Sequence, residues 1–307
     1  MAGRRQRREM GTSFGFRAAK GAKINHRSGV VGLLKVLFFA CSLVAVLAGF
    51  VFLDRYVKQQ NLTPPESRTI ELIGDIPVWI GEEIKNRVYV AAMSGAGGER
   101  ASENVAASVQ HSVEQRVSWL ADVRVQTTYN SIRISGRWRK PLAVVTAGKN
   151  RFFIDADLVV LDYVPVGDLS IVTVSGLEFD KQAPSPGEAW RGDDLAAALA
   201  VLSRLERMDA TVSADKPLLG EIDRIDVSNF DGRQKKREPH IVLYTKDNTQ
   251  ILWGAEIGTW QRHLESPDDD KLAKLYTYYQ QYGTLSGVKY INLRDPQQTI
   301  YLPVDKY

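Results

Sequence analysis

Cysteine is nearly absent from this chain, and its scarcity excludes two kinds of structure. Cys41 is the only cysteine among 307 residues, so no disulfide can form within the chain and no cysteine-based metal site can be built. The four histidines, His26, His111, His240 and His263, stand far apart in the sequence, and none has the spacing of a metal-ligand motif. The sequence therefore predicts folding around a hydrophobic core, with no metal and no cofactor.

Motifs for catalysis are also missing. The glycine-rich stretch at residues 95–98 lacks the Lys-Ser/Thr pair of a phosphate-binding loop, and no Gly-x-Ser-x-Gly sequence occurs. Acidic residues at Asp193-Asp194 and at 268–270 are predicted to begin helices. Carboxylates at a helix N-terminus interact favourably with the helix dipole and can cap the first turn. A cation site or an acid–base pair is the alternative. We expect a non-enzymatic protein without catalytic residues.

Acidic residues are scarce at the N-terminus. Residues 1–29 contain one acid, Glu9, among the basic side chains Arg4, Arg5, Arg7, Arg8, Arg17, Lys20, Lys23 and Arg27. The formal net charge of +4 belongs to this tail, because the rest of the chain has slightly more acidic than basic groups. Charge therefore gives no support for nucleic-acid binding by the large C-terminal part, whereas the tail can contact anionic membrane lipid.

A long apolar run follows the tail. Residues 30–53 carry one charge, Lys35, and as a helix they can cross the roughly 30 Å hydrocarbon core of a bilayer. Three alternatives fit this run less well. A cleaved secretory signal would have a shorter apolar core, and cleavage of a lipoprotein signal at Cys41 would leave an apolar stretch after the lipidated cysteine. A buried core helix would need an apolar partner helix of matching length, which the sequence does not contain. We predict an uncleaved transmembrane helix. The basic flank predicts a cytoplasmic N-terminus and an extracytoplasmic, periplasmic location for the bulk of the chain.

Two folded regions are expected after a polar linker at residues 54–66, which contains Pro64-Pro65 and is predicted to be extended. In the first, residues 67–139, the apolar pattern predicts a strand, two amphipathic helices and a hairpin, in the order β-α-α-β-β. These elements are expected at residues 69–73, 78–93, 102–120, 121–127 and 131–135.

The second region, residues 140–307, is predicted to be rich in strands. Strands are expected at residues 142–146, 151–154, 171–174, 222–227, 241–244, 250–253, 288–293 and 299–302, with a hairpin turn at 246–248. Two helices interrupt them, one opened by Asp193-Asp194, and one opened by residues 266–270 and ended by Gly283. The fold class is therefore α+β.

The second of these helices carries a group of tyrosines, Tyr276, Tyr278, Tyr279 and Tyr282. Helical spacing predicts that two of them face the core and that the others lie on the surface. An interface patch is the alternative, because tyrosine is enriched at binding hot spots.

Several short motifs occur in a recognisable order. Residues 118–125 (SWLADVRV) lead from a helix into a strand, and Arg139-Lys140-Pro141 and residues 152–157 (FFIDAD) follow. Residues 251–254 (ILWG) and 290–294 (YINLR) come near the end of the chain. This series resembles the FtsQ/DivIB family of bacterial cell-division proteins over residues 67–303. The resemblance implies a POTRA-like domain at residues 67–139, placed after one transmembrane helix and before a larger β-rich domain.

The resemblance also implies a function. It predicts a bitopic scaffold of the inner (plasma) membrane at the division septum, which connects divisome proteins of the FtsB/DivIC and FtsL coiled-coil types through its extracytoplasmic part. Binding would occur by β-strand addition at the C-terminal strand. The implied partner-binding residues are Tyr290, Asn292, Arg294, Thr299, Ile300 and Tyr301, and the implied residues at the hinge between the two domains are Trp119, Arg124, Arg139 and Pro141.

Other interpretations stay open on the sequence alone. A membrane-anchored envelope enzyme or ligand-sensing protein would need a cleft with converging carboxylates or histidines in residues 140–307. A scaffold of a different envelope assembly complex would share the architecture, because POTRA-like units occur in other assembly systems. Residues 299–302 could also form an interior strand, which would offer no edge to a partner.

Overall fold

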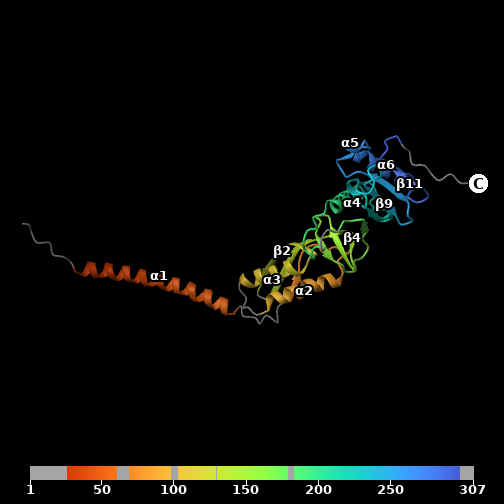
Figure 1. Ribbon diagram of the computed structural model, residues 1–307. Coiled ribbons are helices and arrows are strands. Elements are labelled where there is room, and N and C mark those ends of the chain that lie inside the picture. Colours follow the sequence, from red (N-terminus) through yellow and green to blue (C-terminus); the bar gives the residue numbers. More distant parts are fainter. Residues whose placement is uncertain (1–25, 61–68, 98–102, 129, 179–182, 298–307) are drawn as a thin grey trace, which may run out of the picture. The chain divides into compact units, whose positions relative to one another are not determined.

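The structure is a computed structural model of the chain, and it describes residues 26–60, 69–97, 103–128, 130–178 and 183–297 (Figure 1). For residues 26–36 and 57–60 it describes the backbone alone. The chain divides into two compact units, Met1–Asn61 and Leu62–Tyr307. The first contains one long helix, and the second contains the described strands, so that the protein is of the α+β class.

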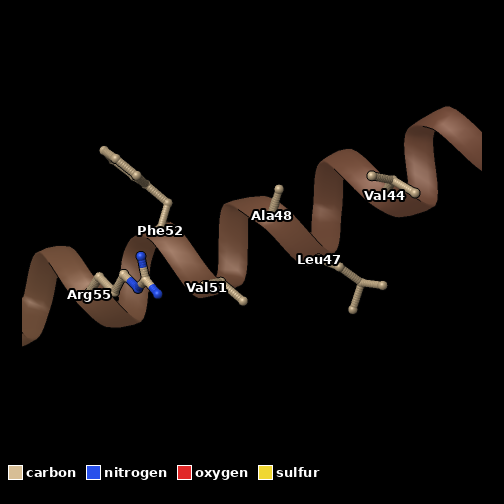
Figure 2. A pocket seen from close by; sticks show the side chains of 6 residues that line it. All are labelled: Val44, Leu47, Ala48, Val51, Phe52 and Arg55. Atoms are coloured by element: carbon tan, nitrogen blue, oxygen red, sulfur yellow. The ribbon is translucent and has the colours of Figure 1, made fainter.

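The first unit contains α1 (His26–Gln60), which includes the apolar run. Within it, Leu37–Tyr56 is long and apolar enough to cross a membrane, and none of this stretch is buried in the protein. Figure 2 shows side chains from one part of it, where Val44, Leu47 and Phe52 project from the helix and Arg55 follows them. Such an apolar surface, exposed over residues 37–53, is suited to a lipid environment.

The helix does not end with the apolar run. α1 continues through residues 54–60, which the sequence predicts as part of an extended linker. That prediction is wrong for these residues, because they contain no proline or glycine and their polar side chains are compatible with a helix in water. Residues 61–66, the other part of the predicted linker, lie outside the described residues.

The second unit begins with a small three-stranded sheet. The sheet and the two helices that accompany it comprise, in chain order, β1 (Thr69–Leu72), α2 (Glu82–Ala96), α3 (Glu103–Arg116), β2 (Leu120–Thr127) and β3 (Ser131–Trp138). This confirms the predicted order β-α-α-β-β. The strand order is β1-β3-β2, with β1 parallel and β2 antiparallel to β3. Buried side chains of both helices, such as Ile84 and Val109, share one hydrophobic cluster with Ile132 and Ile134 of β3.

An eight-stranded sheet follows, in the order β11-β10-β9-β8-β7-β4-β5-β6. Its strands are β4 (Pro141–Ala147), β5 (Asn150–Asp155), β6 (Val160–Asp162), β7 (Val172–Ser175), β8 (Ile222–Asp226), β9 (Ile241–Thr245), β10 (Gln250–Gly254) and β11 (Tyr290–Asn292). β7 is parallel to β4 and β8, β11 is parallel to β10, and the other neighbours are antiparallel. The sequence predicts each of these strands except β6, and the strand predicted at residues 299–302 lies outside the described residues.

Two long helices complete this part of the fold. α4 (Asp193–Val212) and α6 (Asp268–Tyr282) start at the predicted acidic residues, and α6 ends at Gly283, whose φ of 70° suits glycine. α4 has one buried apolar face: Leu195, Ala198, Leu199, Leu202 and Leu205. This face shares the main hydrophobic core with α6 and the eight-stranded sheet. The short α5 (Trp260–His263) and the 3-10 helices η2 (Leu218–Glu221) and η3 (Phe230–Gly232) were not predicted.

The acidic residues that open α4 and α6 lie in the first helical turn, as predicted, but the capping geometry differs. The residues just before the helices are Gly192 and Pro267, and neither makes a side-chain cap. Asp194 instead accepts a hydrogen bond from the backbone N–H of Glu178 at 2.9 Å and pairs with Arg233 at 3.3 Å. Its carboxylate therefore ties the start of α4 to two other segments of the domain.

The tyrosines of α6 are more deeply buried than predicted. Tyr276, Tyr278 and Tyr279 are all buried, whereas Tyr282 is exposed, and its ring packs against that of Tyr278 at a centroid distance of 4.6 Å and a tilt of 36°. The hydroxyl of Tyr276 lies 2.9 Å from the carbonyl oxygen of Leu205 and 2.8 Å from the carboxylate of Asp209. Burial, together with this carboxylate, raises the pKa of Tyr276, so the phenol stays protonated and joins α6 to α4.

Candidate interaction site at the end of the eight-stranded sheet

β11 is the last strand at one end of the described sheet. It pairs in parallel with β10, with Tyr290 opposite Gln250 and Asn292 opposite Leu252. Ile291 points into the core and is fully buried, whereas Tyr290 is exposed. The strand therefore has one buried face and one outer face, as expected for the terminal strand of a sheet.

Arg294 holds the chain in place as it leaves β11. Its backbone carbonyl accepts a hydrogen bond from the N–H of Ser266 at 2.7 Å, and its own N–H donates to the side chain of Asn292 at 3.0 Å. The guanidinium Nε donates to Glu265 at 2.7 Å. Three predicted partner-binding residues, Tyr290, Asn292 and Arg294, thus lie together, and Arg294 positions the chain that leads toward residues 299–302.

Glu265 is the centre of the network that holds Arg294. Its carboxylate is almost fully buried and also accepts hydrogen bonds from Lys271 Nζ at 2.8 Å and from the backbone N–H of Ala255 at 2.9 Å. Burial alone would raise the pKa of Glu265, but the hydrogen bonds from Lys271, Ala255 and Arg294 outweigh it and lower the pKa. Lys271 is itself completely buried. Lys271 and Glu265 therefore form a buried ion pair, and Arg294 is a second cation paired with Glu265.

Gly254 leaves space for this carboxylate. It ends β10 with a φ of 101°, and a Cβ atom at this position would collide with the side chain of Glu265. Glycine is thus required both for the backbone conformation and for the packing of the ion pair.

The need for glycine at this position gives a first prediction. Gly254→Ala should destabilise the protein strongly, because the left-handed backbone costs about 1–3 kcal/mol and the collision displaces Glu265 as well. The matched control is Gly258→Ala, since Gly258 has a φ of 84° and a Cβ atom added there would meet no other atom within 4 Å. Urea unfolding of the full chain in mild detergent compares the two variants. Equal losses of unfolding free energy in the two variants would contradict a collision between a Cβ atom at position 254 and the side chain of Glu265.

A groove of about 600 Å³ runs beside α6 next to this network. Its lining includes Lys274, Tyr278 and Tyr282 of α6 and Pro296 and Gln297 at the end of the described chain. Lys274 Nζ donates to the carbonyl oxygen of Asn292 at 2.9 Å. Burial lowers the pKa of Lys274, although the nearby Asp295 partly offsets this effect. The groove therefore combines aromatic surface with polar groups at the point where the chain approaches residues 299–302.

The remaining predicted partner-binding residues, Thr299, Ile300 and Tyr301, lie outside the described residues. The predicted hinge residues lie elsewhere, near the contact between the two sheets. Trp119 is fully buried there, with its ring 5.9 Å from that of Phe153 in β5. Arg124, by contrast, is exposed on β2.

Arg139 and Pro141 connect the two sheets. Arg139 donates to the buried carboxylate of Asp155 at 2.7 Å, and its backbone N–H donates to the carbonyl oxygen of Trp119 at 2.9 Å. Pro141 is the first residue of β4. Because Val144, Phe153, Leu161 and Val164 also belong to the hydrophobic cluster of α2 and α3, the two sheets share one core at this place. These residues form a packed junction.

Sequence reasoning did not find Asp162, which strengthens the junction. Asp162, at the end of β6, forms an ion pair with Arg87 of α2 and accepts a hydrogen bond from Ser118 Oγ at 2.7 Å. No local pattern marks these residues, because they meet only through the tertiary fold.

The histidines also differ from the expectation. His240 and His263, which stand far apart in the sequence and have no metal-motif spacing, have ring centroids 4.7 Å apart in the structure, and Glu256 lies beside them. Among known proteins, no protein-family model matches the chain, and no curated protein sequence matches it significantly.

Proposed function

We propose that this chain is a non-enzymatic, single-pass scaffold of the bacterial cell envelope that recruits division proteins through its extracytoplasmic part. The proposal rests on the motif series that resembles the FtsQ/DivIB family, on one helix long and apolar enough to cross a membrane, and on the β-α-α-β-β module that follows it. This module would be the POTRA-like domain, and the eight-stranded sheet with α4 and α6 the partner-binding domain.

The observation that carries the proposal is the position of β11. It is the last strand at its end of the described sheet, and the chain leaves it through Arg294, which Glu265 fixes in place. The segment at residues 299–302, predicted as a strand, comes later in the chain, after residues 295–298. A strand at the end of a sheet is where a partner can add its own strand, with backbone hydrogen bonds giving affinity and side-chain pockets giving specificity.

The groove beside α6 is suited to the same role. Tyr282 is exposed and supplies aromatic surface, and the buried Tyr278 packs against its ring. Tyrosine is enriched at hot spots of protein interfaces. We propose that a coiled-coil partner of the FtsB/DivIC type contacts both this groove and residues 299–302, with an FtsL-type protein in the same complex. The inner membrane at the division septum would be the location.

The proposal is tested by crosslinking in intact membranes. A photoreactive residue at Thr299 or Tyr301 should capture a small bitopic coiled-coil protein, whereas the same probe at Glu114, exposed on α3, should not. Capture of an outer-membrane or transport component, or of nothing, would remove the assignment to cell division.

A proline variant tests the mode of binding. Ile300→Pro removes a backbone N–H and should abolish strand addition, and hence capture at Tyr301. Asp305→Pro, placed beyond the predicted strand, is the matched control and should leave capture unchanged. Undiminished capture by a folded Ile300→Pro variant would exclude the strand-addition mode.

A further inference from the structure

A cluster of potential metal ligands lies at one end of the β9–β10 pair. The two strands are antiparallel, and Gly254 at the end of β10 stands opposite Ile241 at the start of β9. His240 directly precedes β9 and Glu256 closely follows β10, so the hairpin brings both to the same end. α5 then turns back, and its last residue is His263.

The three side chains are close enough to share one ion. Each offers one ligand atom, and the three atoms lie within 4.8 Å of one another. His240 Nδ1 lies 2.9 Å from Glu256 Oε1, and the ring of His263 meets that of His240 edge to face, at an interplanar angle of 78°. Ligands bound at about 2.0–2.1 Å in a tetrahedron stand about 3.4 Å apart, so small side-chain rotations would complete the geometry.

The surroundings hold two of the ligands in place. His240 is buried, and Thr259 Oγ1 lies 2.8 Å from the backbone carbonyl oxygen of Glu256 and 3.2 Å from its carboxylate oxygen Oε2. Groups that orient ligands in this way are typical of metal sites, where they fix the carboxylate and reduce the entropy lost on binding. Thr259 therefore acts as a positioning residue for Glu256.

We propose that His240, Glu256 and His263 bind a divalent transition-metal ion of the zinc class. Two imidazoles and one carboxylate form a donor set that Zn²⁺ and its neighbours in the first transition row accept, whereas Ca²⁺ and Mg²⁺ prefer oxygen ligands. Three protein ligands leave a coordination position for water or for a group from a partner. This site is independent of the proposed scaffold function.

Cobalt is a suitable probe, because Co²⁺ occupies zinc sites and absorbs visible light when its coordination number is low. The full chain is purified in mild detergent without a histidine tag, stripped with a chelator and titrated with Co²⁺. Visible absorption should rise to saturation at one equivalent, and Zn²⁺ should then abolish it by displacement. His263→Gln should lose the signal, whereas His111→Gln, an exposed histidine of α3, should keep it.

Further measurements distinguish a lost metal site from a misfolded variant. His240 is buried, so the decisive variants are His263→Gln and Glu256→Gln, each checked for a native circular dichroism spectrum. Zn²⁺ should raise the melting temperature of the unaltered chain and leave that of His263→Gln unchanged. Thr259→Val should weaken Co²⁺ binding by about tenfold. Absence of the Co²⁺ signal in the unaltered chain, or an identical signal in His263→Gln, would overturn the proposal and leave the three residues as a hydrogen-bonded structural cluster.

Discussion

Replacing Glu265 by glutamine is expected to lower the free energy of unfolding by about 3–5 kcal/mol, because it breaks a buried ion pair from one side. Lys271 has no exposed side-chain surface, and its Nζ lies 2.8 Å from the Glu265 carboxylate. Without that negative charge, Lys271 would be a buried cation whose nearest remaining carboxylate is that of Asp268, at 4.0 Å. Arg294 would lose the same partner, while its hydrogen bonds to the backbone of Ser266 and the side chain of Asn292 would still hold the chain there.

Urea unfolding of the full chain in mild detergent, followed by tryptophan fluorescence, measures this effect. The matched control is Glu238→Gln, which breaks the exposed Lys235–Glu238 pair and should cost at most about 1 kcal/mol. The double variant Glu265→Gln/Lys271→Met should recover part of the unfolding free energy lost in Glu265→Gln, since it also removes the buried positive charge. If Glu265→Gln were no worse than Glu238→Gln, the ion pair would not be a major contributor to stability.

Trp119→Ala is expected to cost a similar amount, about 3–5 kcal/mol, because it leaves a large cavity in a packed core. The ring is completely buried and lies between Trp79, at 6.5 Å, and Phe153, at 5.9 Å. Since Phe153 belongs to β5 and Trp119 precedes β2, the cavity opens at the junction of the two sheets. Both sheets should therefore lose stability together.

Two controls define the role of Trp119. Trp119→Phe keeps an aromatic ring in the core and should cost less than Trp119→Ala, and Trp79→Ala removes a neighbour that is only partly buried. Circular dichroism and near-ultraviolet signals should report a single unfolding transition for all three variants. Separate transitions of the two sheets in the unaltered chain would contradict a shared core.

The elements that sequence reasoning predicted correctly are those with strong local periodicity. The apolar face of α4 recurs at helical spacing over several turns, and Gly283 marks the end of α6 by its left-handed backbone. β6 was missed because it is three residues long and follows Leu158, whose φ of 64° interrupts the extended pattern. The helical conformation of residues 54–60 was missed because a polar segment carries little periodic signal.

The site was less predictable because its contacts are not local. Tyr290, Asn292 and Arg294 were predicted from a resemblance, and the structure adds Glu265 and Lys271, whose roles depend on burial that no sequence window reveals. The same holds for His240 and His263. Their proximity requires the β9–β10 hairpin and the turn of α5, which bring together residues that a motif search treats separately.

The parallel pairing of β11 with β10 has a consequence for biogenesis. Parallel neighbours require a crossover connection, and here the connecting chain contains α5 and α6. β11 can therefore join the sheet only after β10 and both helices have been synthesised. A chain that stops before residue 290 would lack β11, so the eight-stranded sheet is completed only after α5 and α6 have been made.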